Sequence, residues 1–163
     1  MGTEIYWHGI LDYDNRDNRK LSEVYRIWKR TEAISEMAGA DYQAAFGLVR
    51  DYDNIWDSQL DVWHMRLAKK SEKEIFTAAQ LNHTPMDMVY LLEDTDAEEL
   101  LKYSVLFYPH PLILTEKRAE VLRTYVEAGG CLILGCRTGQ KDETGKCVMQ
   151  PMPGLLSSLA QTD

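Results

Sequence analysis

Four short apolar segments, separated by longer amphipathic stretches, constrain the fold of this chain more than any other feature of its sequence. They cover residues 44–49, 86–92, 104–108 and 131–136. Each segment is apolar on both faces, as are strands that helices cover on two sides. Because such strands alternate here with helical patterns, the sequence predicts a parallel sheet within a three-layer α/β domain.

Helix signals lie before and between these strands. From Asn18 to Ala38, apolar residues recur at roughly helical spacing, and Gly39 supplies a C-terminal stop. We expect a helix there that could cover one face of a sheet. Thr115 is a typical N-cap for a later helix, which Gly129 and Gly130 close.

Composition limits the kinds of partner. With 163 residues the chain is long enough for one domain with a real core, and its formal charge of −8 disfavours nucleic acid and anionic lipid. The apolar run without a charge at residues 103–115 is too short to span a membrane. Three cysteines without a CxxC pair, and a start without a basic and apolar leader, predict a cytoplasmic protein with reduced thiols.

Two acidic residues after the first strand are the first candidate for chemistry. Asp51 and Asp53 are spaced as in aspartate phosphatases, which hold magnesium between such carboxylates. However, Asn54 and Ile55 follow where those enzymes carry a small hydroxyl residue. The alternatives are a magnesium-dependent phosphatase or small-molecule site, and a plain capping and turn role, which the sequence favours.

Cys136, at the end of the fourth strand, is the second candidate. A nucleophile elbow needs glycine two residues to either side, but here Gly135 is adjacent and Gly139 is three residues away. We therefore expect Cys136 to be a small buried core residue, and His110 cannot be assigned as its base. Phosphate-binding glycine motifs are absent, and the scattered histidines have no metal-ligand spacing and are expected at the surface or in caps. The sequence predicts no catalytic residue, cofactor or metal site.

The chain begins with an unusually aromatic and basic segment, and interfaces concentrate such residues. Trp56 and Trp63 belong either to a similar surface or to the core. A further alternative is a sugar-binding accessory module in which Trp7, Trp56 and Trp63 stack on pyranose rings. The candidate interface residues are Tyr6, Trp7, His8, Arg16, Arg19, Asp53 and Trp56.

The same residues carry a resemblance to a known family. Residues 7–16, followed by Arg19, resemble the segment that leaves the catalytic barrel in family 42 glycoside hydrolases, the microbial β-galactosidases. Residues 51–56, 103–109, 129–130 and 138–143 match the middle domain of that family in the right order.

This resemblance implies a class I glutamine-amidotransferase-like, flavodoxin-like α/β domain without amidotransferase activity, which serves trimerisation of a β-galactosidase. Residues 1–39 would then be the linker and helix from the barrel junction, and residues 40–163 the trimerisation domain, in one compact domain overall. The implied partners are the catalytic barrel of the same polypeptide and the neighbouring subunits of a homotrimer. The two catalytic glutamates of the family lie on that barrel, so no catalytic residue falls within this chain.

Overall fold

The computed structural model describes residues 9–160 and divides the chain into two compact units, Met1–Tyr42 and Gln43–Asp163. In the first unit, helix α2 (Arg19–Glu32) begins after Asn18, whose side chain accepts a hydrogen bond from the Leu21 amide, and a short 3-10 helix follows (Ser35–Met37). The predicted helix is confirmed, although it ends earlier than Ala38. None of its residues is buried, so its packing on a sheet face stays a prediction.

The second unit contains the predicted parallel sheet. Within the described residues its strands are β1 (Phe46–Arg50), β2 (Met86–Tyr90), β3 (Val105–Tyr108) and β4 (Cys131–Leu134). They lie in the order β2-β1-β3-β4, and every neighbouring pair is parallel. All four strand predictions are confirmed, each within a few residues of its expected bounds.

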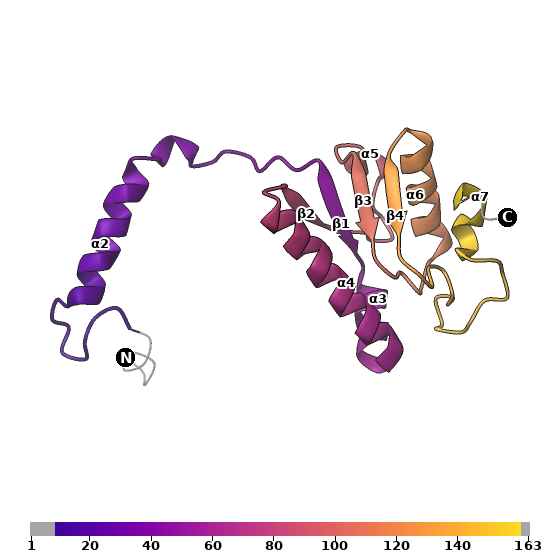
Figure 1. Cartoon of the computed structure of the whole chain (residues 1–163), viewed down its shortest axis with the longest axis horizontal. Helices are drawn as coiled ribbons and strands as arrows, with labels where there is room; N and C mark the ends of the chain where they lie inside the picture. The colour runs from indigo at the N-terminus through magenta and orange to yellow at the C-terminus, as the bar shows by residue number, and fades with distance from the viewer. Residues whose placement is uncertain (1–8, 161–163) are drawn as a thin grey trace. The chain divides into compact units, whose positions relative to one another are not determined.

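Helices lie on both faces of this sheet (Figure 1). Helices α3 (Tyr52–Leu60) and α4 (Val62–Leu81) connect β1 to β2, α5 (Ala97–Leu100) connects β2 to β3, and α6 (Glu116–Glu127) connects β3 to β4. A short 3-10 helix (Gly154–Leu156) and α7 (Ser157–Ala160) end the described chain. Thr115 caps α6 as predicted, by accepting a hydrogen bond from the Arg118 amide.

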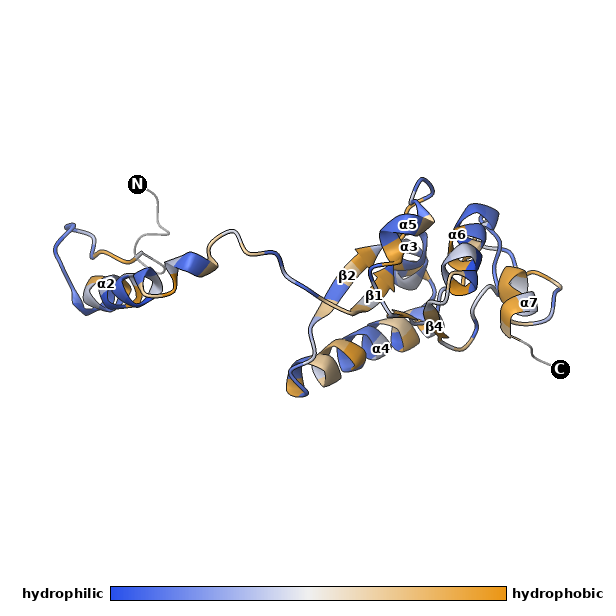
Figure 2. Cartoon of the chain, turned by 90° about the horizontal axis from the view of Figure 1, so that it is seen from above, coloured by the Kyte–Doolittle hydropathy of each residue, from blue (hydrophilic) through white to orange (hydrophobic). Residues whose placement is uncertain are grey.

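Two separate apolar clusters show that the domain has three layers. Leu48 packs with Ala79 of α4 on one face of the sheet, whereas Leu106 packs with Leu122 of α6 on the other. In Figure 2, hydrophobic and hydrophilic residues alternate along α4 and α6, as in helices that bury one side. No helix of the described chain combines the length and the apolar character that crossing a membrane requires.

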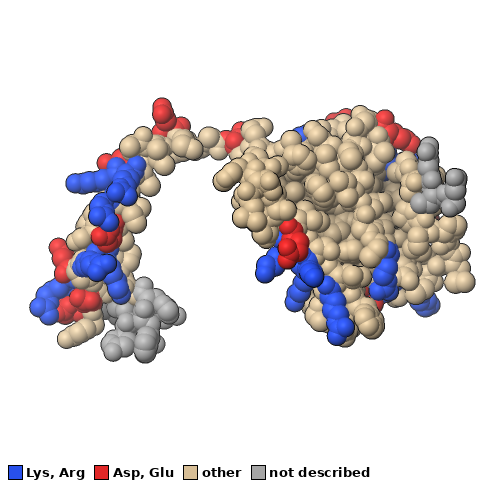
Figure 3. Space-filling model, in the orientation of Figure 1, with Lys and Arg blue, Asp and Glu red and all other residues tan. Residues whose placement is uncertain are grey.

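Helix α4 leaves part of its face of the sheet uncovered. Figure 3, in the orientation of Figure 1, shows a broad area without charged side chains over β3 and β4. There Ile133 is exposed, and Phe107 is only half-buried. Strand β4, which lies at one edge of the sheet, is accordingly less buried than β1.

Candidate functional site

The carboxyl ends of β1 and β3 meet where the chain leaves toward helices on opposite faces of the sheet. Ligands bind at such switch points in open α/β sheets, so this edge is the first place to look for a site. Directly after β1, Asp51 caps α3: its carboxylate accepts hydrogen bonds from the Asn54 amide (2.9 Å) and from the Asn54 side-chain Nδ2 (2.7 Å). The Tyr108 hydroxyl also donates to it, and Arg118 Nη1 lies 3.2 Å away.

These contacts commit the Asp51 carboxylate to the fold. The residue is 1% exposed, and both of its carboxylate oxygens accept hydrogen bonds from protein groups. A phosphatase nucleophile must instead be free to reach substrate and metal. The capping role expected for Asp51 is therefore confirmed. Within residues 9–160, no group of three or more acidic, histidine or cysteine side chains is arranged to hold a metal ion.

Arg118 ties α6 to this end of the sheet. Besides Asp51, its guanidinium contacts Asp53 (Nη2 to Oδ2, 2.6 Å) and Glu93 (Nε to Oε1, 3.0 Å), although its own side chain is almost fully buried. Burial works to lower the pKa of Arg118, but the charges of Asp51 and Asp53 outweigh burial and raise it. Sequence reasoning missed this residue. The available signal was a cation in the first turn of α6, where the helix dipole disfavours one.

A second buried network surrounds His64, which is fully buried in the first turn of α4. Its Nδ1 lies 2.7 Å from Oδ2 of Asp57, and its Nε2 lies 3.1 Å from the carbonyl oxygen of His110. Both neighbours offer oxygen atoms that can accept a hydrogen bond from the ring. The expectation that the histidines lie at the surface or in caps is wrong for His64 and His110, because hydrogen-bond partners compensate their burial.

Lys141 completes this network from the loop after β4. Its ammonium group lies 2.8 Å from both carboxylate oxygens of Asp57 and 3.0 Å from Asp61 Oδ2. Burial works to lower the pKa of Lys141, but its hydrogen bonds to the two carboxylates outweigh burial and raise it. The hydrogen bond from Lys141, with help from the backbone amides of Trp63 and His64, lowers the pKa of Asp61 to about 2.

The lowered pKa of Asp61 predicts that the free energy of unfolding depends on pH, and Lys141→Met should reduce this dependence. The folded pKa of Asp61 lies below its ordinary 3.8, so its stabilising effect is present above that value and is lost as the pH falls through about 2. Asp61 is partly exposed, so we expect the effect to be about 1 kcal/mol. Urea unfolding from pH 5 to 2 should show a smaller loss of stability for Lys141→Met than for the wild type. The exposed control Lys73→Met should follow the wild type; identical pH profiles for all three proteins would contradict the prediction.

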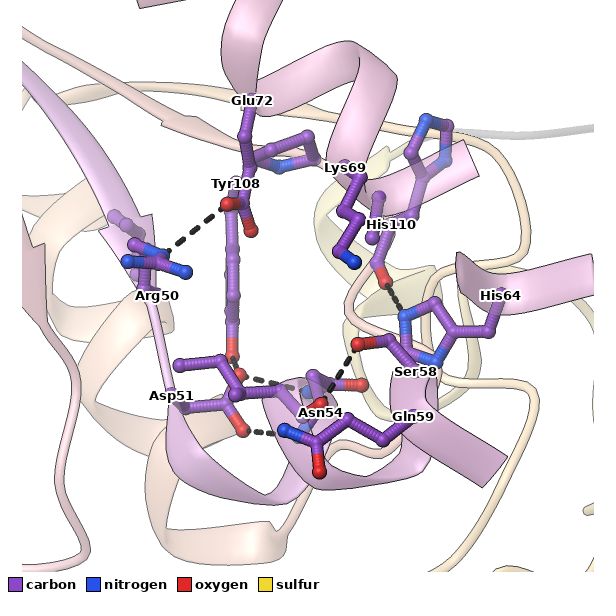
Figure 4. Close-up of a pocket in the computed structure, with 14 residues that line it drawn as sticks. Arg50, Asp51, Asn54, Ser58, Gln59, His64, Lys69, Glu72, Tyr108 and His110 are labelled. Carbon is purple, nitrogen blue, oxygen red and sulfur yellow. Dashed lines mark hydrogen bonds and ion pairs between the residues drawn. The ribbon is translucent and has the colours of Figure 1, made fainter. Parts of the chain in front are cut away.

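Between the two networks lies a pocket of about 130 Å³ (Figure 4). Arg50, Lys69 and Glu72 contribute its charged rim, and Ser58 and Gln59 contribute polar groups from α3. Glu72 pairs with Arg50 (Oε2 to Nε, 3.2 Å), and burial raises the pKa of Glu72 despite that cation. The ion pair between Arg50 and Glu72 joins β1 to α4 at this pocket.

The outer side of α3 presents an exposed apolar stripe. Tyr52, Trp56 and Leu60 follow one another at intervals of four residues, which places them on one side of a helix. The ring of Tyr52 stacks on the ring of Tyr90 in β2, with the two centroids 5.4 Å apart. The ring centroid of Trp56 lies 5.8 Å from that of Tyr52. Trp56 is 58% exposed and Leu60 86%. We call Tyr52, Trp56, Leu60 and Tyr90 the α3 surface.

The structure distributes the predicted interface residues over both units. Trp56 lies on the α3 surface, and Asp53, on the same helix, forms the ion pair with Arg118. Arg16 and Arg19 lie in the first unit, exposed to solvent, where Arg16 pairs with Asp14. Tyr6, Trp7 and His8 lie outside the described residues. Trp63, for which surface and core were equal alternatives, is 67% exposed.

The prediction for Cys136 is wrong. The residue is exposed instead of buried in the core, because the chain turns outward after β4 and no helix follows. Its sulfur lies 3.4 Å from Nδ1 of His110, the residue that could not be assigned from sequence.

Together, these observations define a parallel α/β domain with buried polar networks at its switch point and an exposed aromatic surface on α3. The family model described as "Beta-galactosidase trimerisation domain" matches residues 46–162, and the chain belongs to this family. The resemblance to family 42 glycoside hydrolases is therefore confirmed.

Curated relatives and solved structures agree with this assignment. The chain is 29% identical to the β-galactosidase BgaA of Clostridium cellulovorans, over 98% of the chain and 24% of the relative, and 26% identical to BgaH of Haloferax lucentense, over 98% and 23%. It spans about a quarter of the length of these relatives.

Among solved structures, the β-galactosidase of Bacillus circulans sp. alkalophilus aligns with a TM-score of 0.76 at 19% identity, over 93% of this chain and 22% of that one. A catalytic mutant of a GH42 β-galactosidase from G. stearothermophilus aligns with a TM-score of 0.73 at 20% identity, over 86% and 20%. At this level of identity, the two structures show that the fold is shared.

Proposed function

We propose that this chain is the assembly domain of a larger β-galactosidase and that its α3 surface contributes to contacts between the subunits of a homotrimer. The observation that carries the proposal is the exposed stripe of Tyr52, Trp56 and Leu60. It lies on a domain that belongs to a family of trimerisation domains. Aromatic side chains are enriched at protein interfaces, where they supply large contact areas and lose little conformational entropy on binding. Burying this stripe would remove apolar side chains from water and so favour association.

The ion pair between Asp53 and Arg118 supports this role indirectly. It joins the first turn of α3 to α6 at 2.6 Å, and so holds in place the helix that carries Trp56. The stacking of Tyr52 on Tyr90 fixes the other side of the stripe against β2. A surface held in this way loses little entropy on binding. We assign Arg16, Arg19 and the aromatic residues Tyr6, Trp7 and His8 to contacts with the barrel or with neighbouring subunits.

We further propose that the chain is non-catalytic and that galactoside hydrolysis takes place on a barrel elsewhere in the same polypeptide. The relatives are named β-galactosidases, and each is about four times as long as the matched segment. The proposed topology is amidotransferase-like and flavodoxin-like, because β1 lies between β2 and β3, as in the flavodoxin strand order. All three cysteines are free thiols, which fits the reducing cytoplasm.

Sedimentation of the purified chain tests the role of the α3 surface. We expect concentration-dependent trimers, and we expect the double variant Trp56→Ser, Leu60→Ser to weaken association at least about tenfold, because interface anchors carry most of the binding free energy. Leu81→Ser, which removes an equally exposed leucine from the far end of α4, is the matched control and should sediment as the wild type. A chain that stays monomeric at about 1 mM, or a double variant that trimerises normally, would exclude the α3 surface as the contact.

A further inference from the structure

A cysteine and a histidine meet at the carboxyl ends of β3 and β4, on residues that the proposed assembly role does not use. Cys136 lies just beyond β4 and is exposed, whereas His110 follows β3 and is 9% exposed. The sulfur of Cys136 lies 3.4 Å from Nδ1 of His110, within the range of a hydrogen bond to sulfur. This places an accessible thiol beside a shielded imidazole.

The hydrogen bonds of His110 decide which role its imidazole plays. Nδ1 also lies 2.9 Å from the carbonyl oxygen of Cys136, which can only accept, so Nδ1 must carry the proton. Nε2 then accepts a hydrogen bond from the Ser71 hydroxyl at 2.8 Å. The N–H of Nδ1 therefore lies within hydrogen-bond distance of both the carbonyl oxygen and the sulfur. His110 is a donor that stabilises negative charge on the sulfur, and it does not remove the thiol proton.

Several interactions build this arrangement into the fold. His110 has φ of 55°, a backbone conformation that side chains rarely adopt, and His64 binds its carbonyl oxygen. A Cβ at Gly135 would lie 2.6 Å from the His110 backbone nitrogen, so only glycine allows the two loops to approach. On the other side, the Thr138 hydroxyl donates to the Gly135 carbonyl oxygen at 2.7 Å. Both partners of the contact are thus held in position.

We propose that Cys136 is a reactive thiol that undergoes thiol–disulfide exchange with small soluble disulfides. The thiol proton goes to solvent, and the resulting thiolate attacks one sulfur of the disulfide. A new S–S bond forms between Cys136 and that half of the disulfide, the original S–S bond breaks, and the other half leaves as a thiolate. An N–H donor beside the sulfur favours the thiolate, which is the nucleophilic form.

The other two cysteines provide controls within the same molecule. Cys131 and Cys147 are also exposed, so accessibility alone does not distinguish the three thiols. Within residues 9–160, the sulfur of Cys136 is the one that lies within hydrogen-bond distance of a histidine. Comparison of the wild type with His110→Asn separates the contribution of His110 from other differences among the three thiols.

Glutathione disulfide is the probe, and the purified chain is treated with it over a range of pH before the three cysteine-containing peptides are quantified by mass spectrometry. We expect Cys136 to form the mixed disulfide about tenfold faster than Cys131 and Cys147 at neutral pH, because the N–H of His110 stabilises negative charge on its sulfur. His110→Asn should remove the difference, because asparagine tolerates the left-handed backbone but has a shorter side chain.

Two further measurements keep the test decisive. Ser71→Ala, which leaves the His110 backbone in place, should lower the rate of Cys136 less than His110→Asn does and leave the other two thiols unchanged. Circular dichroism establishes that each variant is folded. If Cys136 reacts no faster than Cys131 and Cys147 in the wild type, or keeps its advantage in folded His110→Asn, the proposal is wrong.

Discussion

Arg118→Met is expected to lower the free energy of unfolding of the second unit by about 3–5 kcal/mol, which is a large part of the about 5–15 kcal/mol that stabilises an ordinary domain. Methionine fills similar space, so the main effect is electrostatic. Without the guanidinium, the buried carboxylate of Asp51 loses its cation, and α6 loses its ion pairs to Asp53 and Glu93. Urea unfolding followed by tryptophan fluorescence measures the change.

Lys117→Met is the matched control, because it removes one positive charge from the same turn of α6 at an exposed position. It should change stability by less than about 0.5 kcal/mol. Adding Asp51→Asn to Arg118→Met should recover part of the loss, since asparagine caps α3 without leaving a buried charge. A loss below about 1 kcal/mol for Arg118→Met would contradict the prediction, because it would mean that the Asp51 carboxylate does not need Arg118 to compensate its charge.

The strands and helix caps could be predicted because their signals are local. An apolar run such as residues 104–108 predicts a buried strand without knowledge of the rest of the chain. Thr115 is likewise only three residues away from Arg118, whose amide it caps. The capping role of Asp51 was equally accessible, because its partner Asn54 lies three residues away. In each case the residues that determine the structure are close neighbours in the chain.

The buried networks could not be predicted because their partners are distant in the chain. Arg118 meets Asp51 across 67 positions, and His64 meets His110 across 46. A charged or polar residue is expected at the surface unless the partner that compensates its burial is known. The prediction for Cys136 failed for a related reason. The segment is apolar up to its end, but Cys136 lies in the turn after β4, where it is exposed and contacts His110, a residue 26 positions away.

Asn54 is the residue where local and distant contacts meet, and its replacement is the second large effect that we expect. Its Oδ1 accepts a hydrogen bond from the Ile113 amide (2.9 Å), and its Nδ2 donates to the Ile113 carbonyl oxygen (2.8 Å) and to Asp51. Asn54→Leu keeps the volume but leaves two buried backbone groups without partners, so urea unfolding should show a loss of about 3–4 kcal/mol.

The control for this replacement is Asn82→Leu, which removes an exposed asparagine that donates one hydrogen bond to the Ala78 carbonyl oxygen at the end of α4. It should lose less than about 1 kcal/mol, because water replaces the lost partner. Equal losses for the two variants would mean that water reaches Ile113 in the Asn54→Leu protein. In that case the ion pair of Asp53 with Arg118 and the stacking of Tyr52 on Tyr90 would be enough to hold the α3 surface against the sheet, and Asn54→Leu would leave trimer formation unchanged.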